Sequence, residues 1–152
     1  MEFQRHKYLK RVIDGKENSL VKIVTGIRRC GKSYLLFNLF KRHLIESGVP
    51  DSNIVAIALD DWNNQDYRNP QLLMQYIDQR LSDTEGLCYI LIDEVQLLDR
   101  FVEVLLSLMH NERCDVYVPK RNNVPPNIKA IPVTIMSEKI VTFLMFLVLR
   151  AP

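Results

Sequence analysis

Residues 26–33 read Gly26-Ile27-Arg28-Arg29-Cys30-Gly31-Lys32-Ser33, and this stretch decides the fold. It matches the phosphate-binding pattern G-x-x-x-x-G-K-[ST] at every fixed position. A short run of β-branched residues, 21–25, precedes it, and an apolar run with helical character, 34–40, follows it. Strand, glycine-rich loop and helix are the context that such a loop requires, because backbone N–H groups at a helix N-terminus bind phosphate oxygens.

This loop predicts a site for a nucleoside triphosphate, and we expect ATP as its ligand. Lys32 is expected to reach the β- and γ-phosphates, and the Ser33 hydroxyl to ligate Mg²⁺. The residues expected to bind the nucleotide are Gly26, Ile27, Arg28, Arg29, Cys30, Gly31, Lys32, Ser33 and Tyr34. Arg28 and Arg29 have an alternative interpretation as solvated loop residues that favour the approach of anions.

A second segment, residues 89–94, supports the first. It reads Tyr-Ile-Leu-Ile-Asp-Glu, an apolar run typical of a strand buried on both faces of a parallel sheet. The carboxyl end of such a strand is where these sheets place their ligands. Asp93 is therefore expected to hold Mg²⁺ through a water, and Glu94 to orient and deprotonate an attacking water. The alternative is a turn-forming acidic pair after a core strand. Gln96 has two interpretations, as a residue that orients the attacking water or as a capping or surface residue.

The rest of the chain alternates strands with helices. The pattern predicts strands at about 21–25, 54–59, 88–92 and 115–118, and helices at about 5–13, 32–46, 70–81 and 100–109. Asn69 and Pro70 are typical of an N-cap followed by the first helical position. Such alternation implies a parallel sheet with right-handed crossovers. The predicted fold is therefore α/β, a P-loop NTPase-like sheet flanked by helices and incomplete at its C-terminal end.

Composition sets broader limits. A chain of 152 residues, 47% hydrophobic and 25% charged, is long enough for one globular domain with an adequate core. Its net charge of +2 gives no argument for nucleic acid or a membrane surface. Three cysteines without a C-x-x-C pair fit a reduced, cytoplasmic setting. The start of the chain is polar and unlike a secretory signal, and the apolar run 140–149 is too short to span a bilayer.

The character of the sequence changes after residue 118. Residues 119–152 contain five of the seven prolines, five basic residues and one acid, Glu138. We therefore divide the chain into a core at 1–118 and an atypical tail at 119–152. One hypothesis is that the tail results from a truncation or a shifted reading frame. The other is that it forms a poorly patterned strand or helix that packs on the sheet.

With both motifs in place, the chain resembles the prokaryotic AAA-type ATPases whose P-loop domain precedes a C-terminal domain of unknown function. The resemblance covers residues 1–118 and is carried by Tyr8-Leu9, the segment 23–33, the segment 90–96 and the strand 115–118. It implies ATP hydrolysis with Mg²⁺. In that family the last strand leads into a small polar segment that senses the γ-phosphate, whereas this sequence has Pro119-Lys120-Arg121. The resemblance therefore supports nucleotide binding more strongly than hydrolysis.

Three functions follow as hypotheses. The first is an ATPase in which Lys32 and Glu94 are catalytic and Ser33 and Asp93 hold the metal. The second is a nucleotide-binding module or truncated fragment without turnover, and the third is a small-molecule kinase. A GTPase is disfavoured because the sequence has no N-K-x-D motif. The process coupled to ATP, any protein or nucleic-acid partner and the oligomeric state, with an arginine finger such as Arg100 or Arg113, stay open.

Overall fold

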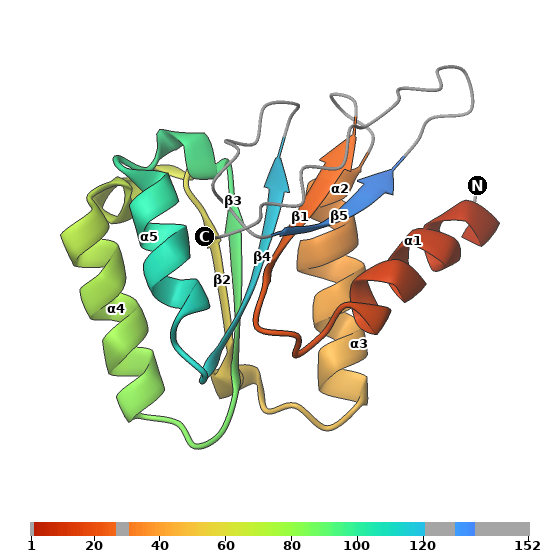
Figure 1. Cartoon of the computed structure of the whole chain (residues 1–152), viewed down its shortest axis with the longest axis horizontal. Coiled ribbons are helices and arrows are strands. Elements are labelled where there is room, and N and C mark those ends of the chain that lie inside the picture. Colours follow the sequence, from red (N-terminus) through yellow and green to blue (C-terminus); the bar gives the residue numbers. More distant parts are fainter. Residues whose placement is uncertain (1, 27–30, 121–129, 136–152) are drawn as a thin grey trace, which may run out of the picture.

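The computed structural model describes residues 2–26, 31–120 and 130–135. In that part of the chain five strands form one sheet in the order β2-β3-β4-β1-β5, and all four neighbouring pairs are parallel (Figure 1). The strands are β1 (Val21–Gly26), β2 (Ile54–Ala58), β3 (Cys88–Asp93), β4 (Cys114–Lys120) and β5 (Ala130–Ile135). β1 comes first in the chain but is an interior strand of the sheet, because it lies between β4 and β5.

Helices cover both faces of this sheet. They are α1 (Glu2–Asp14), α2 (Lys32–Tyr34), α3 (Lys41–Glu46), α4 (Pro70–Ser82) and α5 (Phe101–Met109). A π-helical segment, Leu35–Phe40, joins α2 to α3, and 3₁₀ turns occupy Asp51–Asn53, Trp62–Arg68 and Val95–Leu97. In Figure 1 α4 and α5 lie on one side of the sheet, and α1, α2 and α3 lie on the other. The α/β prediction, a parallel sheet flanked by helices, is confirmed.

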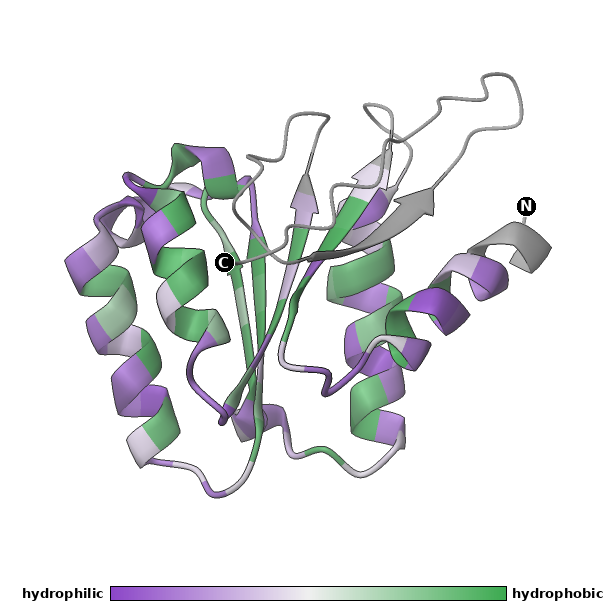
Figure 2. Ribbon diagram, in the orientation of Figure 1, coloured by the Kyte–Doolittle hydropathy of each residue, from purple (hydrophilic) through white to green (hydrophobic). Residues whose placement is uncertain are grey.

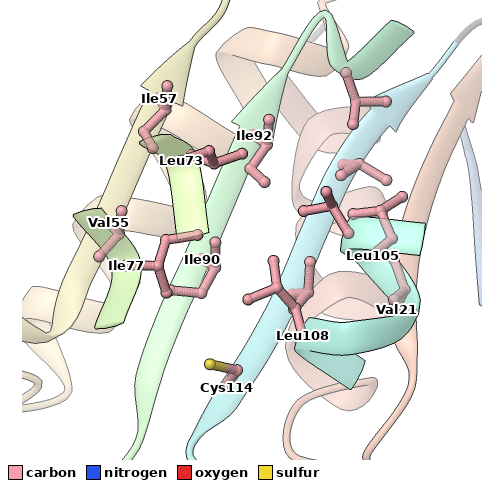
Figure 3. Close-up of a cluster of buried hydrophobic side chains, with 14 of the residues drawn as sticks. Val21, Val55, Ile57, Leu73, Ile77, Ile90, Ile92, Leu105, Leu108 and Cys114 are labelled. Atoms are coloured by element: carbon pink, nitrogen blue, oxygen red, sulfur yellow. The ribbon is translucent and has the colours of Figure 1, made fainter. Parts of the chain in front are cut away.

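The two helical layers enclose two apolar clusters. Successive strand residues point to opposite faces, so Ile90 and Ile92 of β3 join the cluster under α4 and α5, whereas Leu91 joins the cluster under α1 and α3. Figure 2 shows the hydrophobic colour along the strands and on the inner sides of the helices. Figure 3 shows Leu73 and Ile77 of α4 above the strands of the first cluster. Burial on both faces explains why the strand sequences are continuous apolar runs.

Several element boundaries differ from the prediction. The helix predicted at 32–46 is present, but its middle turn is a π-helix, which local patterning does not signal. β4 extends to Lys120, two residues beyond the predicted end. Of the described tail residues, Pro119 and Lys120 belong to β4, and residues 130–135 form β5, which pairs with β1 from Val21 to Gly26. The Asn69 side chain accepts hydrogen bonds from the backbone N–H groups of Gln71 and Leu72, as expected of an N-cap.

A buried polar network joins the amino ends of the central strands. Lys22 of β1 forms an ion pair with Asp115 of β4, and both side chains are almost fully buried. The other Asp115 oxygen accepts hydrogen bonds from the Tyr117 hydroxyl, at 2.6 Å, and from the Glu17 backbone N–H, at 3.0 Å. The Tyr89 hydroxyl of β3 donates to Glu17 at 2.7 Å. Glu17, in the turn between α1 and β1, is thereby bonded to β3 and β4. Among the described residues, no helix combines the length and the apolar character needed to cross a membrane.

Candidate functional site

The predicted site residues that the structure describes lie at the carboxyl edge of the sheet. β1 ends at Gly26, where the loop begins, and β3 ends at Asp93. Parallel strands end at the same edge, so the loop and the acids come together although about sixty residues separate them in sequence. A pocket at this edge is lined by Gly31, Lys32, Ser33, Tyr34, Asp93, Glu94, Gln96 and Pro119. Ile27, Arg28, Arg29 and Cys30 lie outside the described residues.

Gly31 provides the backbone turn that starts the helix. Its φ of 86° and ψ of 25° are left-handed, and its carbonyl accepts the Leu35 N–H at 2.9 Å. A Cβ atom at this position would meet nothing within 4 Å. Glycine is therefore required by the backbone conformation rather than by lack of space. The turn directs Lys32 and Ser33 to the pocket.

Asp93 lies half-buried between the loop and the next turn. One of its oxygens accepts the Glu94 backbone N–H at 2.8 Å, and the Ser33 side chain forms a hydrogen bond with the carboxylate. Burial raises the Asp93 pKa above its ordinary value, an effect that the two hydrogen bonds oppose and that the nearby charges of Glu94 and Asp60 increase. The structure therefore brings Ser33, in α2, into contact with Asp93 at the end of β3.

We expect the Asp93→Asn substitution to stabilise the nucleotide-free chain at neutral pH. Because the Asp93 pKa is raised on folding, the folded chain holds the proton more tightly than the unfolded chain. At the lowest pH the carboxyl is protonated in both states and does not lower the free energy of unfolding. The destabilisation develops as the pH rises from the ordinary carboxyl pKa through the raised pKa of the folded chain. Asparagine keeps an oxygen for both hydrogen bonds.

Urea denaturation of both chains between pH 3 and pH 8 measures this effect. The stability difference between variant and wild type is expected to grow with pH across that window in favour of the variant. Asp66→Asn, which removes an exposed acid outside the pocket, controls for the change in net charge. A difference that stays flat or reverses contradicts the assigned cause.

Glu94 has a strained backbone conformation. Its φ of 50° and ψ of 42° are left-handed, a region that side chains other than glycine, asparagine and aspartate rarely adopt. The surroundings hold it there: its N–H donates to Asp93, and its carbonyl accepts the Leu97 N–H at 2.9 Å. Such strain is concentrated at functional sites. Gln96 also donates from Nε2 to Oε2 of Glu94.

Pro119 closes the pocket from β4. It is buried, and it lies opposite Val24 of β1 in the register of the two strands. The sequence singled out this position as the place where a polar sensor segment was expected. The structure gives it a role that sequence analysis missed, as an apolar part of the pocket wall. Pro119 lies near the loop because β4 pairs with β1, and no local sequence pattern predicts that pairing.

Comparison with known proteins places this arrangement in a family. The model of a family described as AAA domain matches residues 18–120. The chain belongs to the AAA domain family. The membership expected from the two motifs is thus confirmed. An uncharacterized protein of Haemophilus influenzae is 26% identical over 118 residues, which cover 78% of this chain. The chain spans 29% of the length of that relative.

Two side-chain oxygens at the pocket are of the type that magnesium binds. Mg²⁺ is bound by one or two carboxylates, waters and substrate phosphates rather than by a cage of protein ligands. The contact between the Ser33 hydroxyl and Asp93 provides two such protein oxygens at the pocket. Among the described residues, no group of three or more histidines, cysteines or acids is arranged to hold a metal ion. These residues therefore fit a magnesium ion that arrives with a nucleotide.

The arginines considered as fingers have local partners in the AAA domain. Arg113 donates to the backbone carbonyls of Gly86 and Thr84, at 3.0 and 2.8 Å, beside the amino end of β4. That edge is opposite to the pocket. Arg100 forms an ion pair with Glu103 of the same helix turn. The structure brings neither of them into the pocket lining.

Proposed function

We propose that this AAA domain binds ATP together with Mg²⁺ and hydrolyses it. The observation that supports this most strongly is the pocket at the carboxyl edge, in which Lys32, Ser33, Asp93 and Glu94 converge from two elements. Family membership supports nucleotide binding, because AAA domains are nucleotide-binding ATPase-like modules. Phosphoryl transfer requires positioning and charge neutralisation more than covalent chemistry by the protein, and these four side chains supply both.

The binding roles follow from the chemistry of each group. The loop N–H groups would surround the phosphate oxygens, and the Lys32 ammonium would neutralise charge at the β- and γ-phosphates. Ser33 would give up its hydrogen bond to Asp93 to ligate the metal directly, and Asp93 would hold it through a water. Mg²⁺ supplies charge stabilisation of the transferring phosphoryl group. We propose all nine loop residues, 26–34, as the nucleotide-contacting segment.

Glu94 is proposed as the general base. A water molecule attacks the γ-phosphorus and passes its proton to the Glu94 carboxylate as the new P–O bond forms. The bond from the γ-phosphorus to the bridging oxygen breaks, and its electron pair remains on ADP. The products are ADP and inorganic phosphate, and the proton then leaves Glu94 for solvent. The strained backbone of Glu94 supports this role, because it directs the carboxylate to the pocket lining.

A second function, ATP binding without turnover, is favoured by Pro119. Proline has no backbone N–H and no polar side chain, so it cannot contact a γ-phosphate as a polar sensor would. A phosphate-release assay on the purified chain separates the two functions. Steady release in excess MgATP supports hydrolysis, whereas ATP affinity without release supports the binding module.

Replacement of Lys32 by alanine is expected to abolish nucleotide binding at working concentrations. Hydrogen bonds to charged groups contribute about 1.5–3 kcal/mol, so we expect the affinity for MgATP to fall roughly 10- to 100-fold at least. Calorimetric titration of MgATP into both chains measures the change. Lys41→Ala removes a lysine of α3 whose partner is Asp51, and it should bind like wild type. Retained affinity in Lys32→Ala would refute the site assignment.

We also propose a cytoplasmic setting. Cys88 and Cys114 are buried free thiols that lie opposite each other in the β3–β4 register. Unpaired thiols at adjacent positions are typical of a reducing compartment.

A further inference from the structure

Glu94 and Gln96 are joined within the pocket. The Gln96 amide donates from Nε2 to Oε2 of Glu94, and both residues line the pocket with Lys32 and Ser33. A carboxylate accepts hydrogen bonds at both of its oxygens, so a donor fixed on Oε2 leaves Oε1 available. From the sequence, Gln96 is interpreted either as a residue that orients the attacking water or as a capping or surface residue. The hydrogen bond indicates a different role.

The turn that carries Gln96 is held firmly at both ends. Val95 and Leu98 are buried in the apolar cluster beneath α4 and α5, with exposed fractions of 0% and 2%. The Leu97 N–H donates to the Glu94 carbonyl at 2.9 Å, and the Leu98 N–H donates to the Val95 carbonyl at 3.1 Å. These contacts form a 3₁₀ turn, Val95–Leu97. Gln96 therefore projects from a rigid backbone toward the neighbouring glutamate.

The backbone of Glu94 is fixed in the same way. Its N–H donates to Asp93, which itself contacts Ser33 of the loop. What remains free is rotation of the Glu94 side chain about its own bonds. A hydrogen bond from Gln96 removes that freedom, because it selects the rotamers that keep Oε2 at the amide. A general base is effective only when it stands within hydrogen-bond reach of the proton that it accepts.

We propose that Gln96 is the positioning residue for Glu94. Its amide holds Oε2, so that Oε1 is the oxygen that receives the proton of the attacking water. Gln96 touches neither the nucleotide nor the water, and it acts through Glu94 alone. This inference rests on the proposed hydrolysis of ATP, and its test is designed so that the two can fail separately.

The test compares turnover and MgATP affinity in the full chain and its variants. In Gln96→Ala the rate constant kcat is expected to fall about 10- to 100-fold, since small misplacement of a reacting group has effects of that order. The dissociation constant of MgATP should not change. Gln96→Glu keeps the shape of the side chain but has no N–H donor, so its kcat should fall at least as much as that of Gln96→Ala. Gln79→Ala, an exposed glutamine of α4, should behave like wild type.

A double-mutant cycle with Glu94→Gln separates the proposed role from others. If Gln96 acts through Glu94, then Gln96→Ala causes no further loss in the Glu94→Gln background under single-turnover conditions. An equal loss in both backgrounds, or an unchanged kcat in Gln96→Ala, overturns the inference. A wild-type chain that binds MgATP but releases no phosphate also overturns it and leaves the binding site intact. Failure of wild type to bind MgATP refutes the proposed function itself.

Discussion

Substitution of Glu94 by glutamine is expected to reduce kcat for ATP hydrolysis about 10²- to 10⁴-fold, the range that general-base catalysis contributes. Glutamine has nearly the shape of glutamate, but it cannot accept the proton of the attacking water. The left-handed backbone at position 94 is maintained by the Asp93 and Leu97 contacts, which involve main-chain atoms of residue 94. The variant is therefore expected to fold as wild type does.

Affinity for MgATP distinguishes loss of catalysis from loss of the site. The loop, Lys32 and the Ser33–Asp93 pair are unchanged in Glu94→Gln, so its dissociation constant should match that of wild type. Phosphate release and calorimetric titration on the same preparations measure both quantities. Glu112→Gln removes an exposed acid before β4 and is the matched control. Turnover unchanged in Glu94→Gln would remove this residue from the mechanism.

The largest effect on stability is expected from Asp115→Ala. Removal of one partner from a buried ion pair leaves an uncompensated charge and destabilises a protein by about 3–5 kcal/mol. Here the remaining charge is that of Lys22, which is 0% exposed. Burial lowers the Lys22 pKa, and the hydrogen bond and charge of Asp115 oppose this effect. The Tyr117 hydroxyl and the Glu17 N–H lose their acceptor as well.

Thermal and urea unfolding measure this loss. For a domain of this size we expect the midpoint temperature to fall by roughly 6–20 °C, at 2–4 °C for each kcal/mol. The double variant Lys22→Met/Asp115→Leu removes both charges together, and it should recover much of the stability because an apolar pair of similar volume can replace a buried ion pair. A stable Asp115→Ala, or a double variant less stable than the single one, contradicts this account of the network.

Periodicity and caps made most of the fold predictable. The apolar run at 88–92 has the pattern of a strand buried on both faces, and Asn69 with Pro70 marks the start of α4. In each case a local sequence pattern predicts the element that the structure contains. The strand order is not local: β1 reaches its place between β4 and β5 through pairings that join residues far apart in the chain. The sequence therefore predicted a parallel sheet without the position of its fifth strand.

In the candidate site, too, some features were predictable from local motifs and others depend on contacts between distant residues. The fixed positions of the loop and the acidic pair at the end of the predicted third strand identify Lys32, Ser33, Asp93 and Glu94 from the sequence alone. Their roles remain proposals, but the structure does bring all four to one pocket. The left-handed backbone of Glu94 could not be read in advance, because it depends on contacts with Asp93 and on the buried anchors of the following turn. The pairing of β1 with β4 places Pro119 in the lining of the pocket, and no sequence motif predicts this position.

The most direct test of the central claim is a crystal structure of the chain with a non-hydrolysable ATP analogue and Mn²⁺ in place of Mg²⁺. We predict an anomalous peak beside the Ser33 hydroxyl, with Asp93 within reach through one water, and the γ-phosphate beside Lys32 at the loop. A nucleotide bound elsewhere on the sheet, or a metal peak away from both Ser33 and Asp93, would contradict the account.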